Sequence, residues 1–419
     1  MKTYARYKDS GISWIGEIPE HWDVKRVASF FDENKSVNKE LVYKRAYQFK
    51  YGSLVPKNEI GDEKEYEETY VKYTVLNKND IVFNGLNLNY DFVSQRVAIS
   101  PEKGIITSAY IAIVPRNGVE PMYYCWLFKT MDNKKMLHGM GSGIRLTLSY
   151  AELKSQMILH PPISEQKAIV AFLDEKMAKI NELVAAKQKQ IELLKEYKQS
   201  LIANAVTKGI NTKAKMKDSG INWIGQIPEH WEKRKFQYLF KERSEKNHPN
   251  EPILCATQSQ GVIPQSMYEN RVVVVNTGFE GLKLVKKGDF VISLRSFQGG
   301  IEYAYYQGII SAAYTILHIN TEDLFSDYVR ILFKSFPFIS LLKTCVTGIR
   351  EGQNINNDLL RKQFIPVPPV EEQKAIVEFI EKRVASIDAQ ISSIEKQIEN
   401  LNEYKQSLIS DVVTGKVKV

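Results

Sequence analysis

The chain carries the same fifteen-residue segment twice. KDSGISWIGEIPEHW occupies residues 8–22 and KDSGINWIGQIPEHW occupies residues 217–231; the copies differ only at Ser13/Asn222 and Glu17/Gln226. They lie 209 positions apart, whereas the repeats of solenoid proteins recur about every 20 to 50 residues. The repeated unit is therefore large, and the sequence indicates an internal duplication.

A second repeated block follows each copy of this segment, which we call the signature. PPISEQKAIV begins at Pro161 and PPVEEQKAIV begins at Pro368, and both blocks continue to an EYKQSLI segment. The region between signature and block, which we call the body, has diverged except for short stretches near its end. A duplication that keeps its frame and changes its body predicts one architecture with two specificities, although drift of surface loops would also change a body.

Each of the two blocks has the pattern of a long helix. Apolar residues recur at alternating spacings of four and three, with Lys187, Lys198 and Lys405 as polar interruptions, and neither run contains Pro or Gly. A single apolar stripe needs a partner, and the other copy offers a matching one. The residues predicted to pair the helices are Ile180, Val184, Ile191, Leu194, Ile387, Ile391, Ile394 and Ile398.

The short connection after the first helix predicts the direction of pairing. Only GINTKAKM separates the end of this helix, near Lys208, from the second signature, and eight residues span at most about 28 Å. The second body must then begin near the far end of the first helix. The second helix starts from that body, so it can pair only by running back, antiparallel to the first.

Short apolar and β-branched runs bounded by turn residues fill the two bodies. The predicted strands are KNDIVFNG, ITSAYIAIVP, RVVVVNTG, KKGDFVISLRS and GIISAAYTILHI, and the predicted short helices are PMYYCWLFKTM and FSDYVRILFKS. The expected fold class is α+β, with a pseudo-two-fold internal repeat. Two α/β-type domains at residues 1–160 and 210–367 are separated by an antiparallel coiled coil of long helices at 161–209 and 368–419.

The charge of the chain favours a polyanionic partner. Its formal net charge is +8, and an excess of Lys and Arg supplies the salt-dependent phosphate attraction behind nucleic-acid binding. Arg pairs with guanine, and Asn or Gln with adenine, through two hydrogen bonds in the major groove. The candidate DNA-binding residues are Asn84, Asn87, Asn89, Arg96, Arg145, Arg295, Ser296, Gln298, Arg350, Gln353 and Asn354.

Two of these candidates occupy matching places in the repeat. Arg145 and Arg350 each follow a Gly-Ile pair, where a flexible loop could approach a phosphate backbone. Any single member of the set could equally be a turn residue or a solvated loop side chain.

We find no pattern of catalysis in the sequence. It has no GxxxxGK[ST] phosphate loop, no glycine-rich cofactor loop and no cluster of His, Cys or carboxylates at metal-ligand spacing. We therefore expect no catalytic residue, no metal and no cofactor.

Other residues are expected to serve the fold. The isolated Cys125, Cys255 and Cys345 are predicted to be buried, and the tryptophans of the signatures are predicted to be packing anchors. No apolar run approaches the roughly 18 residues that span a bilayer, and the N-terminal segment lacks the apolar stretch of a signal peptide. We expect no membrane partner and a cytoplasmic location.

The paired KDSGIxWIGxIPEHW signatures, the GIR segments and the paired PPxxEQxAIV…EYKQSLI helices resemble the specificity subunit of type I restriction-modification systems. The resemblance covers the whole chain. It implies that each body is a target recognition domain that reads one half of a bipartite, asymmetric site in double-stranded DNA. It also implies that the helices set the gap between the half-sites and dock two modification (methyltransferase) subunits, and that restriction subunits supply ATP-driven translocation and cleavage.

Two other classes of function are weighed against this one. A nuclease or methyltransferase in its own right would need an active site, for which the sequence has no motif. A coiled-coil protein that only assembles partners would show no sequence preference in any complex.

Overall fold

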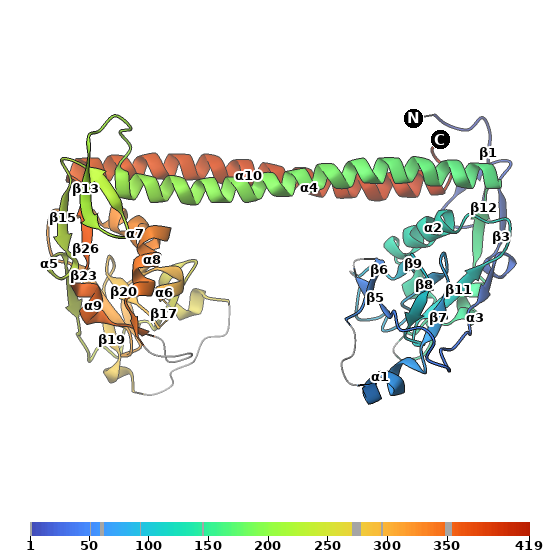
Figure 1. Ribbon diagram of the computed structural model, residues 1–419, viewed down its shortest axis with the longest axis horizontal. Coiled ribbons are helices and arrows are strands. Elements are labelled where there is room, and N and C mark those ends of the chain that lie inside the picture. Colours follow the sequence, from blue (N-terminus) through green and yellow to red (C-terminus); the bar gives the residue numbers. More distant parts are fainter. Residues whose placement is uncertain are drawn as a thin grey trace. The chain divides into compact units, whose positions relative to one another are not determined.

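The computed structural model describes residues 2–50, 52–58, 63–92, 94–144, 146–269, 278–294, 296–347 and 354–419. The chain forms two compact units (Figure 1): unit 1 comprises Met1–Lys187 with Lys396–Val419, and unit 2 comprises Gln188–Glu395. The long helices α4 (Ile163–Lys208) and α10 (Val370–Val413) each contribute one half to each unit. The division into two domains and two separate long helices stays a prediction from the sequence.

Unit 1 is built on a four-stranded antiparallel sheet in the order β4-β11-β8-β9. The strands are β4 (Phe31–Glu33), β11 (Ile111–Pro115), β8 (Ile81–Phe83) and β9 (Val97–Ile99). Successive side chains of a strand point to opposite faces, so Ile81 and Phe83 enter the main core of the unit while Val82 enters a smaller core on the other face. The apolar run of β8 is explained by burial on both faces.

Two-stranded antiparallel pairs complete unit 1. They are β1 (Tyr7–Asp9) with β2 (Glu17–Pro19), β3 (Asp23–Arg26) with β12 (Met157–His160), β5 (Tyr47–Lys50) with β6 (Ser53–Pro56), and β7 (Thr74–Leu76) with β10 (Gly104–Ile106). The helices are α1 (Glu63–Tyr70), α2 (Pro121–Asn133) and α3 (Tyr150–Lys154).

Unit 2 repeats this plan with the sheet order β16-β23-β20-β21. The sheet strands are β16 (Phe240–Arg243), β23 (Thr315–Ile319), β20 (Phe290–Ile292) and β21 (Glu302–Tyr303). The strand pairs are β13 (Met216–Ile221) with β14 (Gly225–Pro228), β15 (Glu232–Lys235) with β26 (Phe364–Val367), β17 (Leu254–Thr257) with β18 (Gly261–Pro264), β19 (Lys283–Val285) with β22 (Gly308–Ile310), and β24 (Val346–Thr347) with β25 (Asn354–Ile355). The helices are α5 (Phe236–Leu239), α6 (Ser296–Gly299), α7 (Ser326–Lys334), α8 (Phe336–Thr344) and α9 (Asn357–Arg361). The α+β fold predicted from the sequence is confirmed.

The halves of α4 and α10 pair in antiparallel fashion within each unit, as predicted. In unit 1 the ammonium of Lys405 donates to Asn181 Oδ1 at 2.7 Å, and Lys187 donates to Gln397. In unit 2 Lys198 donates to Asp388 Oδ1 at 2.7 Å. The three lysines that interrupt the apolar stripes therefore each reach a polar residue of the facing helix.

The residues predicted to pair the helices are all at least partly buried. Five of them are buried, namely Ile180, Ile191, Ile387, Ile391 and Ile394. Three of them are partly buried, namely Val184, Leu194 and Ile398.

Each signature is bonded to the first turn of the long helix that follows its body. The Glu165 carboxylate accepts hydrogen bonds from Trp22 Nε1 at 3.0 Å, His21 Nε2 at 2.6 Å and Tyr4 Oη at 2.7 Å. Burial opposes ionisation of Glu165, but these hydrogen bonds outweigh it and hold the pKa of the carboxyl below its usual value. We call this arrangement the anchor of unit 1.

Unit 2 has the corresponding anchor. Glu372 accepts from Trp231 Nε1 at 3.0 Å and from His230 Nε2 at 2.7 Å. Both Trp22 and Trp231 are fully buried, which confirms them as packing anchors.

The glutamine that follows each of these glutamates joins the start of a short helix to the first turn of the long helix. Gln166 Oε1 accepts from the backbone N–H of Glu120, which precedes α2, and Gln373 Oε1 accepts from that of Phe325, which precedes α7. Backbone N–H groups at the start of a helix have no hydrogen-bond acceptor within the helix. In each EQ pair, the glutamate therefore bonds to the signature, and the glutamine bonds to the start of the short helix.

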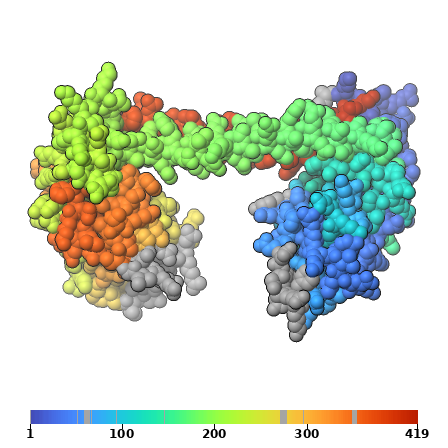
Figure 2. All heavy atoms as spheres, in the orientation of Figure 1, coloured from blue at the N-terminus to red at the C-terminus, as the bar shows by residue number. Residues whose placement is uncertain are grey.

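The far end of each long helix closes against the other signature. α4 ends at Lys208, and Gly209 follows with φ +76° beside Trp231; after α10, Gly415 has φ +76° and lies against Trp22 and Pro19. A side chain at Gly415 would meet Pro19 at 2.5 Å, so this close approach requires glycine. In Figures 1 and 2 the red C-terminal residues lie beside the blue N-terminal residues of unit 1, where the backbone N–H of Lys418 donates to the carbonyl of Lys2.

Two further observations concern the chain as a whole. Cys125, Cys255 and Cys345 are buried, as predicted. Within the described ranges, no helix is both long enough and apolar enough to cross a membrane.

Candidate nucleic-acid interface

The candidate residues fall on two segments of each unit, and these segments occupy equivalent places. In unit 1 they are loop 84–96, which follows β8, and hairpin 142–147, which precedes α3. In unit 2 they are the segment after β20, which runs into α6, and the hairpin of β24 and β25, which precedes α9. Strands β8 and β20 hold the same position in their sheets, so the described candidates that follow these strands lie in the same part of the fold.

Hydrogen bonds join the two segments of unit 1. The backbone N–H of Leu88 donates to the carbonyl of Leu146 at 3.2 Å, and Asn89 Nδ2 donates to the carbonyl of Ile144 at 3.3 Å. Asn87 is exposed, whereas Asn84 and Asn89 are partly buried. Arg145 lies outside the described residues.

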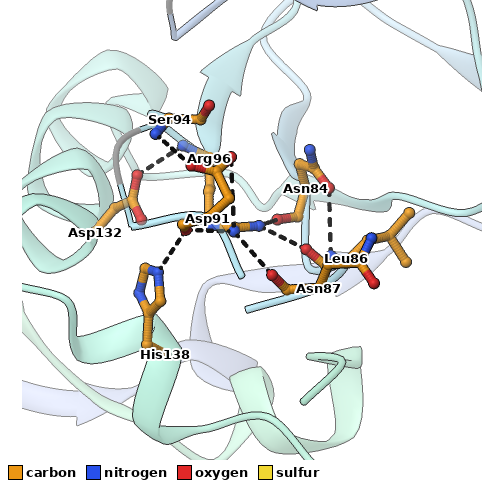
Figure 3. A network of polar contacts seen from close by, with 8 residues as sticks. All are labelled: Asn84, Leu86, Asn87, Asp91, Ser94, Arg96, Asp132 and His138. Atoms are coloured by element: carbon orange, nitrogen blue, oxygen red, sulfur yellow. Dashed lines mark hydrogen bonds and ion pairs between the residues drawn. The ribbon is translucent and has the colours of Figure 1, made fainter. Parts of the chain in front are cut away.

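Arg96 lies in a different environment from the exposed one expected of a base reader (Figure 3). Its side chain is 2% exposed, and its guanidinium donates to four backbone carbonyls of loop 84–96. The acceptors and distances are Asn84 at 3.1 Å, Leu86 at 2.7 Å, Asn87 at 3.3 Å and Asp91 at 2.7 Å. Arg carries five N–H donors in a fixed fork, and here these donors close the loop instead of facing solvent.

Neighbouring polar groups hold this network in place. Asp132 of α2 accepts from the backbone N–H of Arg96 at 2.6 Å, and burial raises the pKa of the Asp132 carboxyl. His138 lies within hydrogen-bond distance of the Asp91 carbonyl, at 3.0 Å from Nε2 (Figure 3). Asn87 has φ 52°, a left-handed conformation that Asn tolerates better than most residues. Asn87 therefore has a conformational role in the turn, whatever else its side chain contacts.

In the segment after β20, one candidate DNA-binding residue is buried and another is exposed. Ser296 is 1% exposed and its Oγ accepts from the backbone N–H of Ser293 at 2.8 Å, so the structure places it in a turn and not on the surface that was expected. Gln298 is exposed and lines a cavity of about 570 Å³ together with Gln258, Tyr268 and Tyr314.

The second hairpin of unit 2 is described only at its base. Asn354 is exposed and pairs with Thr347 across the two strands. Arg295, Arg350 and Gln353 lie outside the described residues, and so does most of the predicted strand at 271–278.

Sequence reasoning missed a set of exposed apolar residues on unit 1. Tyr90 is 76% exposed, Phe92 is 54% exposed and Ile144 is 96% exposed. The signal available in the sequence was NLNYDF, in which two aromatic residues stand among Asn and Asp residues that favour an exposed turn.

The part of the chain that the structure describes has no group of three or more His, Cys, Asp or Glu side chains placed to hold a metal ion. The buried carboxylates near the sheets serve the fold: Asp80 accepts from Asn34 Nδ2 at 2.8 Å, and Asp289 accepts from Arg243 Nε at 2.7 Å.

Comparison with known proteins agrees with this geometry. The family described as "Type I restriction modification DNA specificity domain" matches twice, at residues 19–193 and 225–401. The type I restriction enzyme MjaVIII specificity subunit of Methanocaldococcus jannaschii is 24% identical over 420 residues, which cover 96% of this chain and 94% of the relative.

Solved structures share the fold. A chain from the work described as "Structural basis underlying complex assembly and conformational transition of the type I R-M system" aligns with a TM-score of 0.69 and 14% identity, over 96% of this chain and 99% of that chain. The HsdS subunit from Thermoanaerobacter tengcongensis aligns with a TM-score of 0.55 and 16% identity, over 96% of this chain and 98% of that chain. With its two matched domains, the chain belongs to the family of type I restriction-modification DNA specificity domains, as a specificity subunit that carries two of them.

Proposed function

We propose that unit 1 reads one half of a bipartite DNA site and unit 2 reads the other half. The observation that carries this proposal is the combination of a repeated frame with different surfaces. The sheets have the same order and the anchors share a Trp–Glu and a His–Glu hydrogen bond, whereas the segments after β8 and β20 differ in length and in side chains. As a specificity subunit, the chain supplies recognition, and the partner subunits of such a system supply the chemistry.

We assign different roles to the candidate residues. The exposed Asn87, Gln298 and Asn354 are proposed to contact DNA directly. Arg145, Arg295, Arg350, Gln353, Asn84 and Asn89 remain candidates because of their position in the same segments. Arg96 and Ser296 are proposed to shape the loops that carry these residues.

We also propose that two modification subunits dock in the same way, one on each unit. The signature keeps residues that are exposed in both copies and lie outside the anchors, namely Lys8/Lys217 and Glu20/Glu229. Packing does not require exposed side chains to stay the same, so a partner common to both units explains their identity. A restriction subunit would join the same complex, which we place in the cytoplasm with its DNA.

The proposal is tested by mapping methylated adenines at base resolution in the genome of cells that express this chain with its modification subunit. We expect a bipartite motif with a fixed gap that disappears when the chain is removed. Absence of any chain-dependent motif, while the chain and the modification subunit still form a complex, would favour a protein that only assembles partners. Methylation or cleavage by the purified chain alone would favour an enzyme.

A further inference from the structure

Three large side chains project from the joined loops of unit 1. We call Tyr90, Phe92 and Ile144 the apolar crest; their exposed fractions are 76%, 54% and 96%. Single exposed apolar residues are common, but a group of them on adjoining loops marks an interaction site. Asn89, next to Tyr90, bonds to the carbonyl of Ile144, so the crest residues of loop 84–96 and of hairpin 142–147 belong to one surface.

The loop that carries most of the crest is held in a defined conformation. Arg96 bonds the carbonyls of Asn87 and Asp91 on either side of Tyr90. The ring of Phe92 stacks on His138 with centroids 4.7 Å apart and an interplanar angle of 17°. A surface ordered in this way before binding loses little conformational entropy when a partner arrives.

The repeat indicates which partner the crest meets. A partner that docks equally on both units would meet side chains that both copies share. Tyr90 and Phe92 have no exposed aromatic counterpart in the described part of the segment after β20, because that segment enters α6 at Ser296, whereas the chain after β8 forms the long loop 84–96 before β9. Ile144 differs from these two residues, since Ile349 stands at the matching place of the second GIR segment. DNA is a partner that differs between the two units, because each unit reads a different half-site.

We infer that the apolar crest is a specificity-determining surface that packs against thymine methyl groups in the half-site read by unit 1, with Arg96 as its positioning residue. This inference rests on the proposed function. The methyl group of thymine is the one apolar group that base pairs present in the major groove, and apolar side chains are its usual contacts. The crest therefore selects A·T pairs at defined positions of one half-site.

The test uses the complex of the full chain with its modification subunits and duplexes that contain the mapped site. Each thymine of the unit 1 half-site is replaced in turn by deoxyuridine, which removes the methyl group and keeps base pairing. We expect at least one replacement to weaken binding by about threefold to fivefold, as expected for the loss of one buried methyl group.

The variants Tyr90→Ala, Phe92→Ala and Ile144→Ala link this loss to the crest. At least one of them should bind the deoxyuridine and thymidine duplexes equally well. Leu294→Ala is the matched control, because Leu294 is 51% exposed on the corresponding segment of unit 2; it should leave the effect at the unit 1 half-site unchanged. An unchanged deoxyuridine effect in all three crest variants, or no effect of deoxyuridine in the wild type, would overturn the inference.

Arg96→Lys tests the positioning role, since lysine keeps the charge but lacks the fork of donors. We expect the deoxyuridine effect at the unit 1 half-site to shrink while recognition of the unit 2 half-site is kept. A variant with lower thermal stability and a normal deoxyuridine effect would show that Arg96 serves stability alone. Failure of the proposed function is distinguishable from all these results, because then no chain-dependent methylation motif would exist.

Discussion

The anchors and the loops after β8 and β20 show two opposite outcomes of the same duplication. In the anchors, the indole N–H of Trp22 and that of Trp231 each donate to a glutamate at 3.0 Å, and a histidine bonds the same carboxylate in both units. In the loops, Arg96 of unit 1 donates to four backbone carbonyls, whereas the described residues after β20 in unit 2 form a turn in which Ser296 accepts from the backbone N–H of Ser293. A buried, fully bonded group tolerates little change, whereas a loop that is closed by its own residues can be replaced as a whole.

The largest expected effect follows from exchanging one body. Replacing the body of unit 1, from β3 to β12, by that of another specificity subunit should change one half-site completely and leave the other half-site and the gap unchanged. The retained anchor residues are the reason, because they hold any body with the same frame. Methylation mapping measures the outcome, and a change in both half-sites would contradict the division of labour.

The frame itself is tested by lengthening both long helices. We expect that one heptad inserted after Lys187 and one after Glu395 will widen the gap by about three base pairs, because seven helical residues add about 10 Å and DNA rises about 3.4 Å per base pair. Both half-sites should stay the same. An insertion of seven residues keeps the heptad phase, and an unaltered gap would refute the proposal that the helices set it.

A smaller effect is expected from the anchors. Glu165→Gln should destabilise unit 1 by about 2 kcal/mol at pH 7, since hydrogen bonds to a charged group are lost. Glu372→Gln, the matched control in unit 2, should cost less because its carboxylate accepts from two side chains where Glu165 accepts from three. Urea unfolding of the two variants measures the difference.

The pH dependence of the Glu165→Gln effect gives an independent check. The pKa of Glu165 is lower in the folded chain than its usual value, so its ionised form stabilises unit 1 above the pKa of the unfolded chain, and this contribution is lost as the pH falls through the folded pKa. The difference in the free energy of unfolding between wild type and variant should therefore be smaller below pH 4 than at pH 7. An equal difference at both pH values would show that the charge of Glu165 is irrelevant to stability.

The smallest effect concerns two lysines at equivalent positions. Lys198 meets Asp388, whereas Lys405 meets the neutral Asn181, and burial lowers the pKa of Lys405. Asp388→Asn should reduce the free energy of unfolding by at most about 1 kcal/mol, with the difference shrinking at high salt. Asn181→Asp should give a change of the opposite sign in thermal unfolding, and equal signs would contradict an electrostatic origin.

Much of the frame could be predicted because its signals are local. The alternating apolar residues predicted helices at 161–209 and 368–419, where the structure has α4 at Ile163–Lys208 and α10 at Val370–Val413. The short connection after Lys208 was enough to predict antiparallel pairing. The bonds between the EQ pairs and the signatures could not be predicted. Their signal in the sequence was that both segments are retained in both copies.

The role of Arg96 could not be predicted from its neighbours in the sequence. A guanidinium can pair with guanine or close a loop, and the choice depends on long-range packing. Here Asp132, which lies 36 residues away, fixes the backbone of Arg96, and loop 84–96 folds around the side chain. The same limit applies to Ser296, whose burial depends on how the turn after β20 packs.

The closure of α10 on the first signature has a consequence for synthesis of the chain. Leu408, Val412 and Val413 belong to the core of unit 1, and Tyr123 donates to the carbonyl of Val413. The ribosome adds these residues only after all of unit 2. Unit 2 is continuous in sequence and can complete its core first, while unit 1, although translated earlier, exposes an unfilled core until the end of α10 emerges. The order of translation is thus the reverse of the order in which the two cores are completed.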